Sequence, residues 1–221
     1  MSQHFVREIE QLKKKLLTVG AMVEERIAKA FVAVIKNDAK LALDVVDGDE
    51  EIDQMEVEVE EDCLKILALY QPVAIDLRFV VAVLKINNDL ERMADHAVNI
   101  ARRAEYLAAY PNAGLPPDLE IMLQRTQAMV RDSLDALVRQ DPILARWVCA
   151  ADKEVDQLNR QMHVLIQQQI RSNPERVEQL VHQLSVSRQL ERIADLATNV
   201  AEDVVYTVEG AIIRHRTAAY K

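Results

Sequence analysis

Carboxylates spaced four residues apart are the strongest chemical signal in this sequence. Residues four apart on a helix lie on one face, with Cβ atoms about 5–6 Å apart, so each pair repels unless a cation neutralises it. Carboxylate oxygens suit hard or borderline cations such as Mg²⁺, Mn²⁺, iron or Ca²⁺ better than soft, thiol-seeking metals. We therefore predict metal ligands at four pairs, which are Asp49 with Asp53, Glu91 with Asp95, Asp152 with Asp156, and Glu191 with Asp195.

The acidic pairs belong to a sequence repeat. Residues 90–101 (LERMADHAVNIA) and 190–201 (LERIADLATNVA) are identical at eight of twelve positions, at a constant shift of 100. Residues 49–55 (DEEIDQM) match 152–158 (DKEVDQL) at a shift of 103. If the helices that carry these segments are antiparallel neighbours, four carboxylates converge in each half of the chain. Two or more bridged metal ions would offset that much negative charge better than one.

Three further residues are secondary candidates for ligands. Asn99 and Asn199 follow the acidic pair by four residues in each copy of the repeat. His96 directly follows Asp95 and could donate a ring nitrogen, but its counterpart is Leu196. The histidine therefore cannot be essential to both sites.

A solvated acidic face is the competing explanation for the same residues. A single E-x-x-x-D is common on charged helices, and Arg92 and Arg192 could pair with it in surface contacts worth about 0–1 kcal/mol. Four pairs at matched positions in two halves favour metal binding over that explanation.

Apolar residues at alternating intervals of three and four predict long helices that position these carboxylates. With Val83 at heptad position a, Glu91 and Asp95 fall at b and f, outside the apolar seam. Gly48 lies inside the second predicted helix and permits a kink there. Proline after Asp141 and after Asn173 predicts a capped helix start in both places. The predicted helices cover residues 1–36, 38–69, 72 to the break near 110, 119–139, 141–171 and about 174–210.

The segment 110–117 (YPNAGLPP) is the one obvious break in the helical pattern, because it holds three prolines and a glycine. Short connections elsewhere make neighbouring helices antiparallel. We therefore predict an all-α fold of two tandem three-helix bundles related by internal duplication. The first covers residues 1–111, and the second covers 112–221 with a short basic C-terminal tail.

Composition excludes several classes of protein. Aromatic residues make up 4% of the 221 residues and glycine occurs only four times, which disfavours a sheet protein. A net charge of −9 argues against nucleic-acid binding. Two lone cysteines and the lack of a membrane-spanning run or signal peptide predict a cytoplasmic protein. The sequence has no nucleotide-binding glycine motif, E-x-x-H pattern or recognisable nucleophile motif, so we do not expect an enzyme.

The repeated E-x-x-x-D-x-x-x-N segments, the tandem three-helix halves and the segment 199–206 (NVAEDVVY) together resemble the PhoU family of bacterial phosphate-signalling regulators. The turn at 71–78 (QPVAIDLR) is also similar to that family's entry into its third helix. The resemblance covers essentially the whole chain.

This resemblance implies a negative regulator of the phosphate-starvation response and of phosphate uptake. It implies an adaptor between a membrane ABC phosphate importer and a sensor histidine kinase, cytoplasmic or peripheral at the inner membrane through those partners. It also implies a homodimer and multinuclear metal sites on the eight carboxylates, with iron, Mn, Mg or Zn as the metal.

The sequence departs from the family pattern at Leu196, where the family often has histidine after the aspartate. The two sites therefore need not be equivalent. Two other functions stay open from the residues alone. One is a metal-dependent hydrolase that uses bridged cations to activate water, and the other is a plain helical scaffold with solvated acidic faces.

Overall fold

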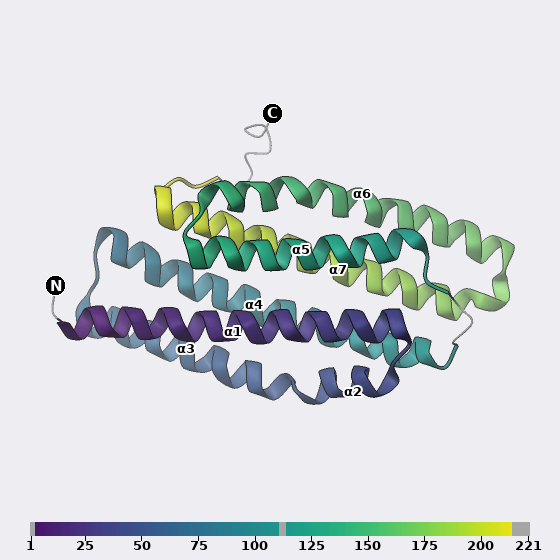
Figure 1. The fold of residues 1–221 in the computed structure, drawn as a ribbon, viewed down its shortest axis with the longest axis horizontal. Coiled ribbons are helices and arrows are strands. Elements are labelled where there is room, and N and C mark those ends of the chain that lie inside the picture. The colour runs from purple at the N-terminus through teal and green to yellow at the C-terminus, as the bar shows by residue number, and fades with distance from the viewer. Residues whose placement is uncertain (1–2, 111–113, 214–221) are drawn as a thin grey trace.

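A computed structural model describes residues 3–110 and 114–213 of the chain. The elements in these ranges are helical, which confirms the predicted all-α class, and the long helices run alongside one another (Figure 1). None of the described helices is long and apolar enough to cross a bilayer. The elements are α1 (Gln3–Lys36), α2 (Ala39–Asp47), α3 (Asp49–Tyr70), α4 (Ala74–Ala108), α5 (Pro117–Arg139), α6 (Pro142–Ser172), the 3₁₀ turn η1 (Pro174–Arg176) and α7 (Val177–Glu209).

Two predicted features fall partly outside the described residues. These are residues 111–113 of the predicted break and residues 214–221 of the predicted basic tail, which lie outside the described ranges.

The turn that ends the first helix has the same structure in both halves, with a left-handed residue followed by a capping aspartate. Asn37 and Gln140, which are 103 residues apart, both have φ = 51° and so turn the chain out of α1 and α5 in the left-handed conformation. Asp38 then accepts a hydrogen bond from the backbone N–H of Leu41 at 3.0 Å. Asp141 caps α6 in the same way, as predicted, and accepts from two backbone N–H groups at 2.9 and 3.1 Å. These caps satisfy amides that the first turn of a helix leaves without partners.

The helix predicted over 38–69 is divided at Gly48 into α2 and α3. The guanidinium of Arg26 on α1 reaches this break, where it donates to the carbonyl oxygen of Gly48 and to Asp49 Oδ1. The first contact satisfies a carbonyl near the end of α2, and the second places a cation beside the first acidic residue of α3. The interruption therefore positions part of the candidate site.

The predicted cap at Asn173 is wrong. Its side chain makes no capping hydrogen bond, and Pro174 begins the 3₁₀ turn η1 instead of α7. The helix proper starts at Val177, three residues later than the proline signal indicates. Proline fixes its own φ and is compatible with either kind of first turn, so its position alone does not decide between them.

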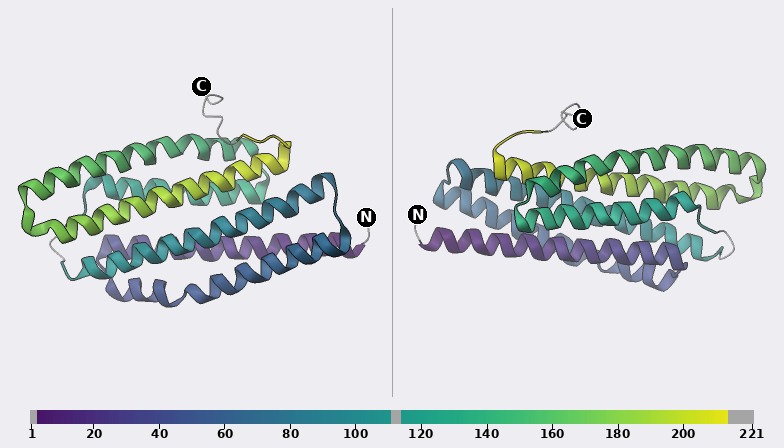
Figure 2. Two further views of the ribbon diagram at one scale, coloured as in Figure 1. Left: turned by 180° about the vertical axis from the view of Figure 1, so that it is seen from behind. Right: turned by 45° about the horizontal axis from the view of Figure 1, so that its top comes forward.

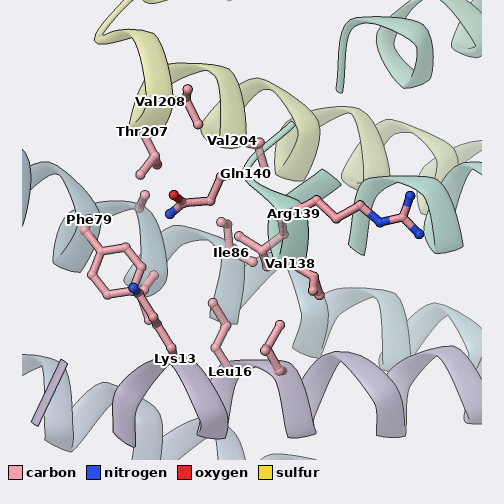
Figure 3. A pocket seen from close by; sticks show the side chains of 14 residues that line it. Lys13, Leu16, Phe79, Ile86, Val138, Arg139, Gln140, Val204, Thr207 and Val208 are labelled. Atoms are coloured by element: carbon pink, nitrogen blue, oxygen red, sulfur yellow. The ribbon is translucent and has the colours of Figure 1, made fainter. Parts of the chain in front are cut away.

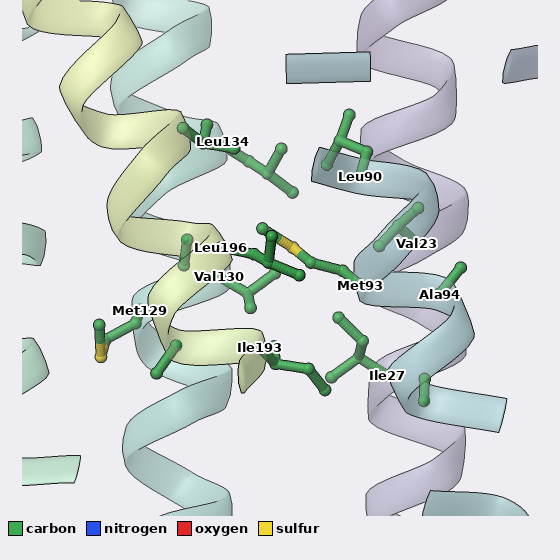
Figure 4. Packing of buried hydrophobic residues seen from close by; sticks show 14 of the residues in the cluster. Val23, Ile27, Leu90, Met93, Ala94, Met129, Val130, Leu134, Ile193 and Leu196 are labelled. Atoms are coloured by element: carbon green, nitrogen blue, oxygen red, sulfur yellow. The ribbon is translucent and has the colours of Figure 1, made fainter. Parts of the chain in front are cut away.

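The two halves pack through α4 and α7, which lie side by side in the middle of the bundle (Figures 1 and 2). Helices α1 and α3 cover α4 in the first half, and α5 and α6 cover α7 in the second. Buried apolar residues of both halves form one continuous cluster. Figure 4 shows Met93 pointing from α4 toward Leu196 and Val130, with Ile193 and Ile27 beneath them.

We predict that Ile193→Ala lowers the free energy of unfolding by about 2–5 kcal/mol, because the side chain is fully buried where the halves meet. Urea denaturation followed by circular dichroism would measure this, and the shared core predicts one transition for both halves. Val181→Ala on the same helix is the control, and at 51% exposure it should cost less than about 0.5 kcal/mol. Two separate transitions, with only the second shifted by Ile193→Ala, would contradict the shared core.

Candidate functional site

The packing of α3 against α4 brings together the first acidic cluster, which consists of Asp49, Asp53, Glu91 and Asp95. Burial raises the pKa of Glu91, and the negative charges of Asp95, Asp53, Glu56 and Asp49 raise it further. Carboxylates from both helices therefore lie within electrostatic range of one another, as the antiparallel arrangement predicts. The second member of each pair is exposed and the first is half-buried, so the cluster faces outward.

The second acidic cluster repeats this arrangement on α6 and α7 with Asp152, Asp156, Glu191 and Asp195. Burial raises the pKa of Asp152 to about 6, together with the charges of Asp195, Asp156, Glu191 and Glu202. The pKa of Glu191 is also raised, first by burial and then by Asp195 and Asp156. The fold therefore holds these carboxylates close together against their mutual repulsion.

A polar link at matched positions fixes the register of the helix pair behind each cluster. Asn87 on α4 donates from its side-chain amide to the backbone oxygen of Glu56 on α3 at 2.9 Å. Ser187, 100 residues later on α7, donates to the side-chain oxygen of Asn159 on α6 at 2.6 Å. Asn87 and Ser187 are both buried, and a buried polar group that lost its partner would cost about 1–3 kcal/mol. These links therefore hold the two carboxylate pairs of each half opposite one another.

The two clusters differ in the charge around them. Asp49 pairs with Arg26 at 2.7 Å, and that arginine opposes the effect of burial on the pKa of Asp49. The residue 103 positions after Arg26 is Met129, so the second cluster has no matching cation from α5. Glu202 adds negative charge near Asp152, whereas the residue 100 positions before it is Arg102. The two clusters therefore differ in the charged side chains beside their first aspartates, with Arg26 near Asp49 and Glu202 near Asp152.

Sequence reasoning missed Arg26 and Glu202 as parts of these sites. The signal was available in the repeat, because extending the shift of 103 into α1 pairs Arg26 with Met129 and the shift of 100 pairs Glu202 with Arg102. The ion pair with Asp49 joins residues 23 apart, and no local spacing indicates it.

The secondary candidates lie at the edge of the clusters or away from them. Asn99 and Asn199 are half-buried, one turn beyond the second carboxylate of each E-x-x-x-D pair. His96 lies near α7 of the other half. Burial lowers its pKa, the side chain of Gln189 acts in the opposite direction, and Arg192 lowers it further. Its counterpart Leu196 is buried in the contact between the halves (Figure 4).

The donor set fits a hard cation, although the side chains do not enclose one in this conformation. Within residues 3–110 and 114–213, no three His, Cys, Asp or Glu side chains are close enough together to hold a metal ion. Asp152 nevertheless has a buried carboxylate oxygen, Oδ1, without a hydrogen-bond partner. Closure around an ion would therefore require side-chain rotation, and it would supply a partner for that oxygen. The ligand role of the eight carboxylates stays a prediction.

Comparison with known proteins agrees with the duplicated architecture. The family model described as the PhoU domain matches twice, at residues 16–104 and 119–204. A protein of Aquifex aeolicus named phosphate-specific transport system accessory protein PhoU homolog is 39% identical over 210 residues, which cover 95% of each chain. The protein of that name from Pseudomonas aeruginosa is 36% identical over 219 residues, covering 97% of this chain and 89% of the relative.

Solved structures have the same fold. The crystal structure of PhoU from Pseudomonas aeruginosa superposes with a TM-score of 0.88 at 36% identity, and it covers 94% of this chain and 100% of that one. The crystal structure of the phosphate transport system regulatory protein PhoU from Streptococcus pneumoniae superposes with a TM-score of 0.87 at 29% identity. The match covers 94% of this chain and 98% of that one. The relatives are named accessory or regulatory proteins rather than enzymes, in agreement with the sequence-based prediction. On the two domain matches and this near-complete coverage, the chain belongs to the PhoU family.

Proposed function

We propose that the protein is an accessory regulator of a phosphate-specific transport system. It would repress the phosphate-starvation response and limit phosphate uptake when phosphate is plentiful, as a cytoplasmic homodimer that links a membrane ABC importer to a sensor histidine kinase. The observation that supports the role as an accessory regulator is the match over nearly the full length to relatives named phosphate-specific transport system accessory protein PhoU homolog. The importer, the kinase and the second copy are partners that the family resemblance implies.

We further propose that both acidic clusters bind divalent or trivalent metal ions, in multinuclear form. The supporting observation is that each half gathers four carboxylates from two helices, with raised pKa values at Glu91, Asp152, Glu191 and Asp195. A bound cation would neutralise this repulsion and could bridge to acidic or phosphorylated groups of a partner. The residues of this chain would hold the ion at the outer face of each half.

In protein freed of metal by a chelator, we predict that Asp152→Asn stabilises the fold at about pH 7.5 by on the order of 1 kcal/mol, after discounting for solvent screening. The pKa of Asp152 in the folded state is raised from 3.8 to about 6. Above about pH 6 the carboxylate is charged in both states, and this charge destabilises the folded state relative to the unfolded state. The gain should shrink as the pH falls through about 6 and vanish below 3.8. Urea denaturation at several pH values would measure it.

Asp49→Asn is the matched control for this pH effect, because Asp49 is the counterpart of Asp152 in the first half. Arg26 opposes the effect of burial on the pKa of Asp49, so Asp49→Asn should increase the free energy of unfolding less than Asp152→Asn does. An equal or larger gain at Asp49 would show that the difference in charge between the clusters has no effect on stability.

For the metal sites, we predict that Asp95→Ala combined with Asp195→Ala weakens Mn²⁺ binding at least about tenfold in calorimetric titration. Glu120→Ala with Glu175→Ala removes two exposed carboxylates outside the clusters and should leave binding unchanged. Identical titrations for wild type and the double aspartate variant would rule out the proposed sites. Turnover of a phosphate ester that depends on Glu91 or Asp95 would favour the hydrolase alternative instead.

For the regulatory role, we predict that deletion of the gene raises expression of phosphate-starvation genes at high phosphate. Reintroduction of the wild-type gene should restore repression, and a reporter for the phosphate regulon would measure both. Unchanged repression in the deletion strain would refute this role, whatever the outcome of the metal titrations.

A further inference from the structure

An apolar cavity of about 270 Å³ lies between the two halves of the chain. Its wall is formed by α1 and α4 from the first half and by α5, the turn after it and α7 from the second. Figure 3 shows Leu16 of α1 and Val204 of α7 on opposite sides of it. A molecule bound there would therefore contact both halves.

The floor of the cavity is buried, whereas its rim is open to solvent. Leu16, Val83 and Ile86 in the floor are at most 2% exposed. Leu17 and Val138, which also line the cavity, are 37% and 56% exposed. An apolar cavity has too few polar partners to hold ordered water, and covering apolar surface is favourable. The lining therefore suits an apolar molecule that enters from the rim.

Two uncharged polar groups give this apolar lining a polar side. Figure 3 shows the side-chain amide of Gln140 pointing into the cavity on the side where Thr207 lies. The Thr207 hydroxyl donates to the backbone oxygen of Asp203 at 2.7 Å, so its own oxygen can still accept a hydrogen bond. The amide of Gln140 offers both a donor and an acceptor. Together they match a ligand group that donates and accepts, such as a hydroxyl.

The charged residues of the wall do not favour an ionic ligand. Lys13 is paired with Glu10 at 3.2 Å, and Arg139 is paired with Asp135 at 3.3 Å. The guanidinium of Arg139 extends away from the cavity (Figure 3). Among the described residues that line the cavity there is no Asp or Glu. Because an ion loses far more hydration energy than an uncharged group on entering apolar surroundings, the fitting ligand is uncharged.

The volume of the cavity sets the size of the ligand. An apolar cavity of about 150 Å³ engineered in another protein accepts benzene, which has six carbon atoms. In proportion, a cavity of about 270 Å³ accommodates an apolar body of about ten carbon atoms.

We propose that this cavity binds an uncharged amphiphile. Its aliphatic body, of about eight to ten carbon atoms, lies between the halves, and its hydroxyl head meets Gln140 and Thr207. The site uses none of the carboxylates of the acidic clusters and does not depend on the proposed regulatory role. Because the wall comes from both halves, the bound molecule stabilises their packing.

A series of 1-alkanols tests this proposal on the full chain. In calorimetric titrations, binding should be saturable, and the affinity should increase about fourfold per methylene from 1-hexanol to 1-octanol. The increase should stop near about ten carbon atoms, where the chain no longer fits. Leu16→Ala enlarges the floor and should move this limit to longer chains, which a variant that is merely less stable would not do. 1-Octanol should also raise the unfolding temperature of the wild type.

The polar end is tested by Gln140→Gly, which removes the amide and should weaken 1-octanol binding roughly three- to tenfold. Gln140 has φ = 51°, a conformation that glycine adopts readily, so the turn keeps its shape. Asn37→Gly is the matched control, because Asn37 has the same φ in the equivalent turn of the first half and does not line this cavity. The control variant should bind 1-octanol as wild type does.

Absence of saturable binding, or an equal loss in the Asn37→Gly control, would overturn the proposal. An affinity that keeps rising up to 1-dodecanol would also overturn it, because it would indicate adsorption to the surface instead of a cavity of fixed size. Tighter binding of octanoate than of 1-octanol would contradict the uncharged head.

Discussion

The packing of α4 against α7 is the contact on which the rest of the structure depends. Both helices carry a buried apolar stripe that faces the other half, and Figure 4 shows Met93 of α4 pointing toward Leu196 of α7, with Ile193 below them. Each helix is also covered by two helices of its own half. Because these contacts use most of the surface of α4 and α7, only one strip of each remains near solvent. The E-x-x-x-D residues lie on that strip.

This packing explains why the two halves have different residues at some equivalent positions and the same residues at others. His96 and Leu196 occupy equivalent places near the contact between the halves, where the neighbours of each come from the opposite half. The two positions have different surroundings, so one can hold a polar ring and the other an aliphatic side chain. The four carboxylates of each cluster face one another within their own half, and all four are repeated.

The electrostatic difference between the clusters arises in the helices that surround them. Arg26 reaches the first cluster from α1 because α2 and α3 are separated at Gly48, where its guanidinium satisfies a carbonyl and an aspartate together. In the second half α6 continues without interruption through the matching region, and Met129 stands where an arginine would be needed. One local break in a helix thus changes the charge of a site whose own four carboxylates are otherwise repeated.

The sequence by itself determined the helical class, the duplication and the eight carboxylates, because heptad spacing and a constant repeat shift are local properties of the chain. It also predicted the cap at Asp141, where the side chain accepts from amides two and three residues away. Only the tertiary structure decided which helices bring Arg26 and Glu202 to the clusters and place His96 between the halves. Those features depend on contacts between residues far apart in the chain, and such contacts follow from packing rather than from spacing along one helix.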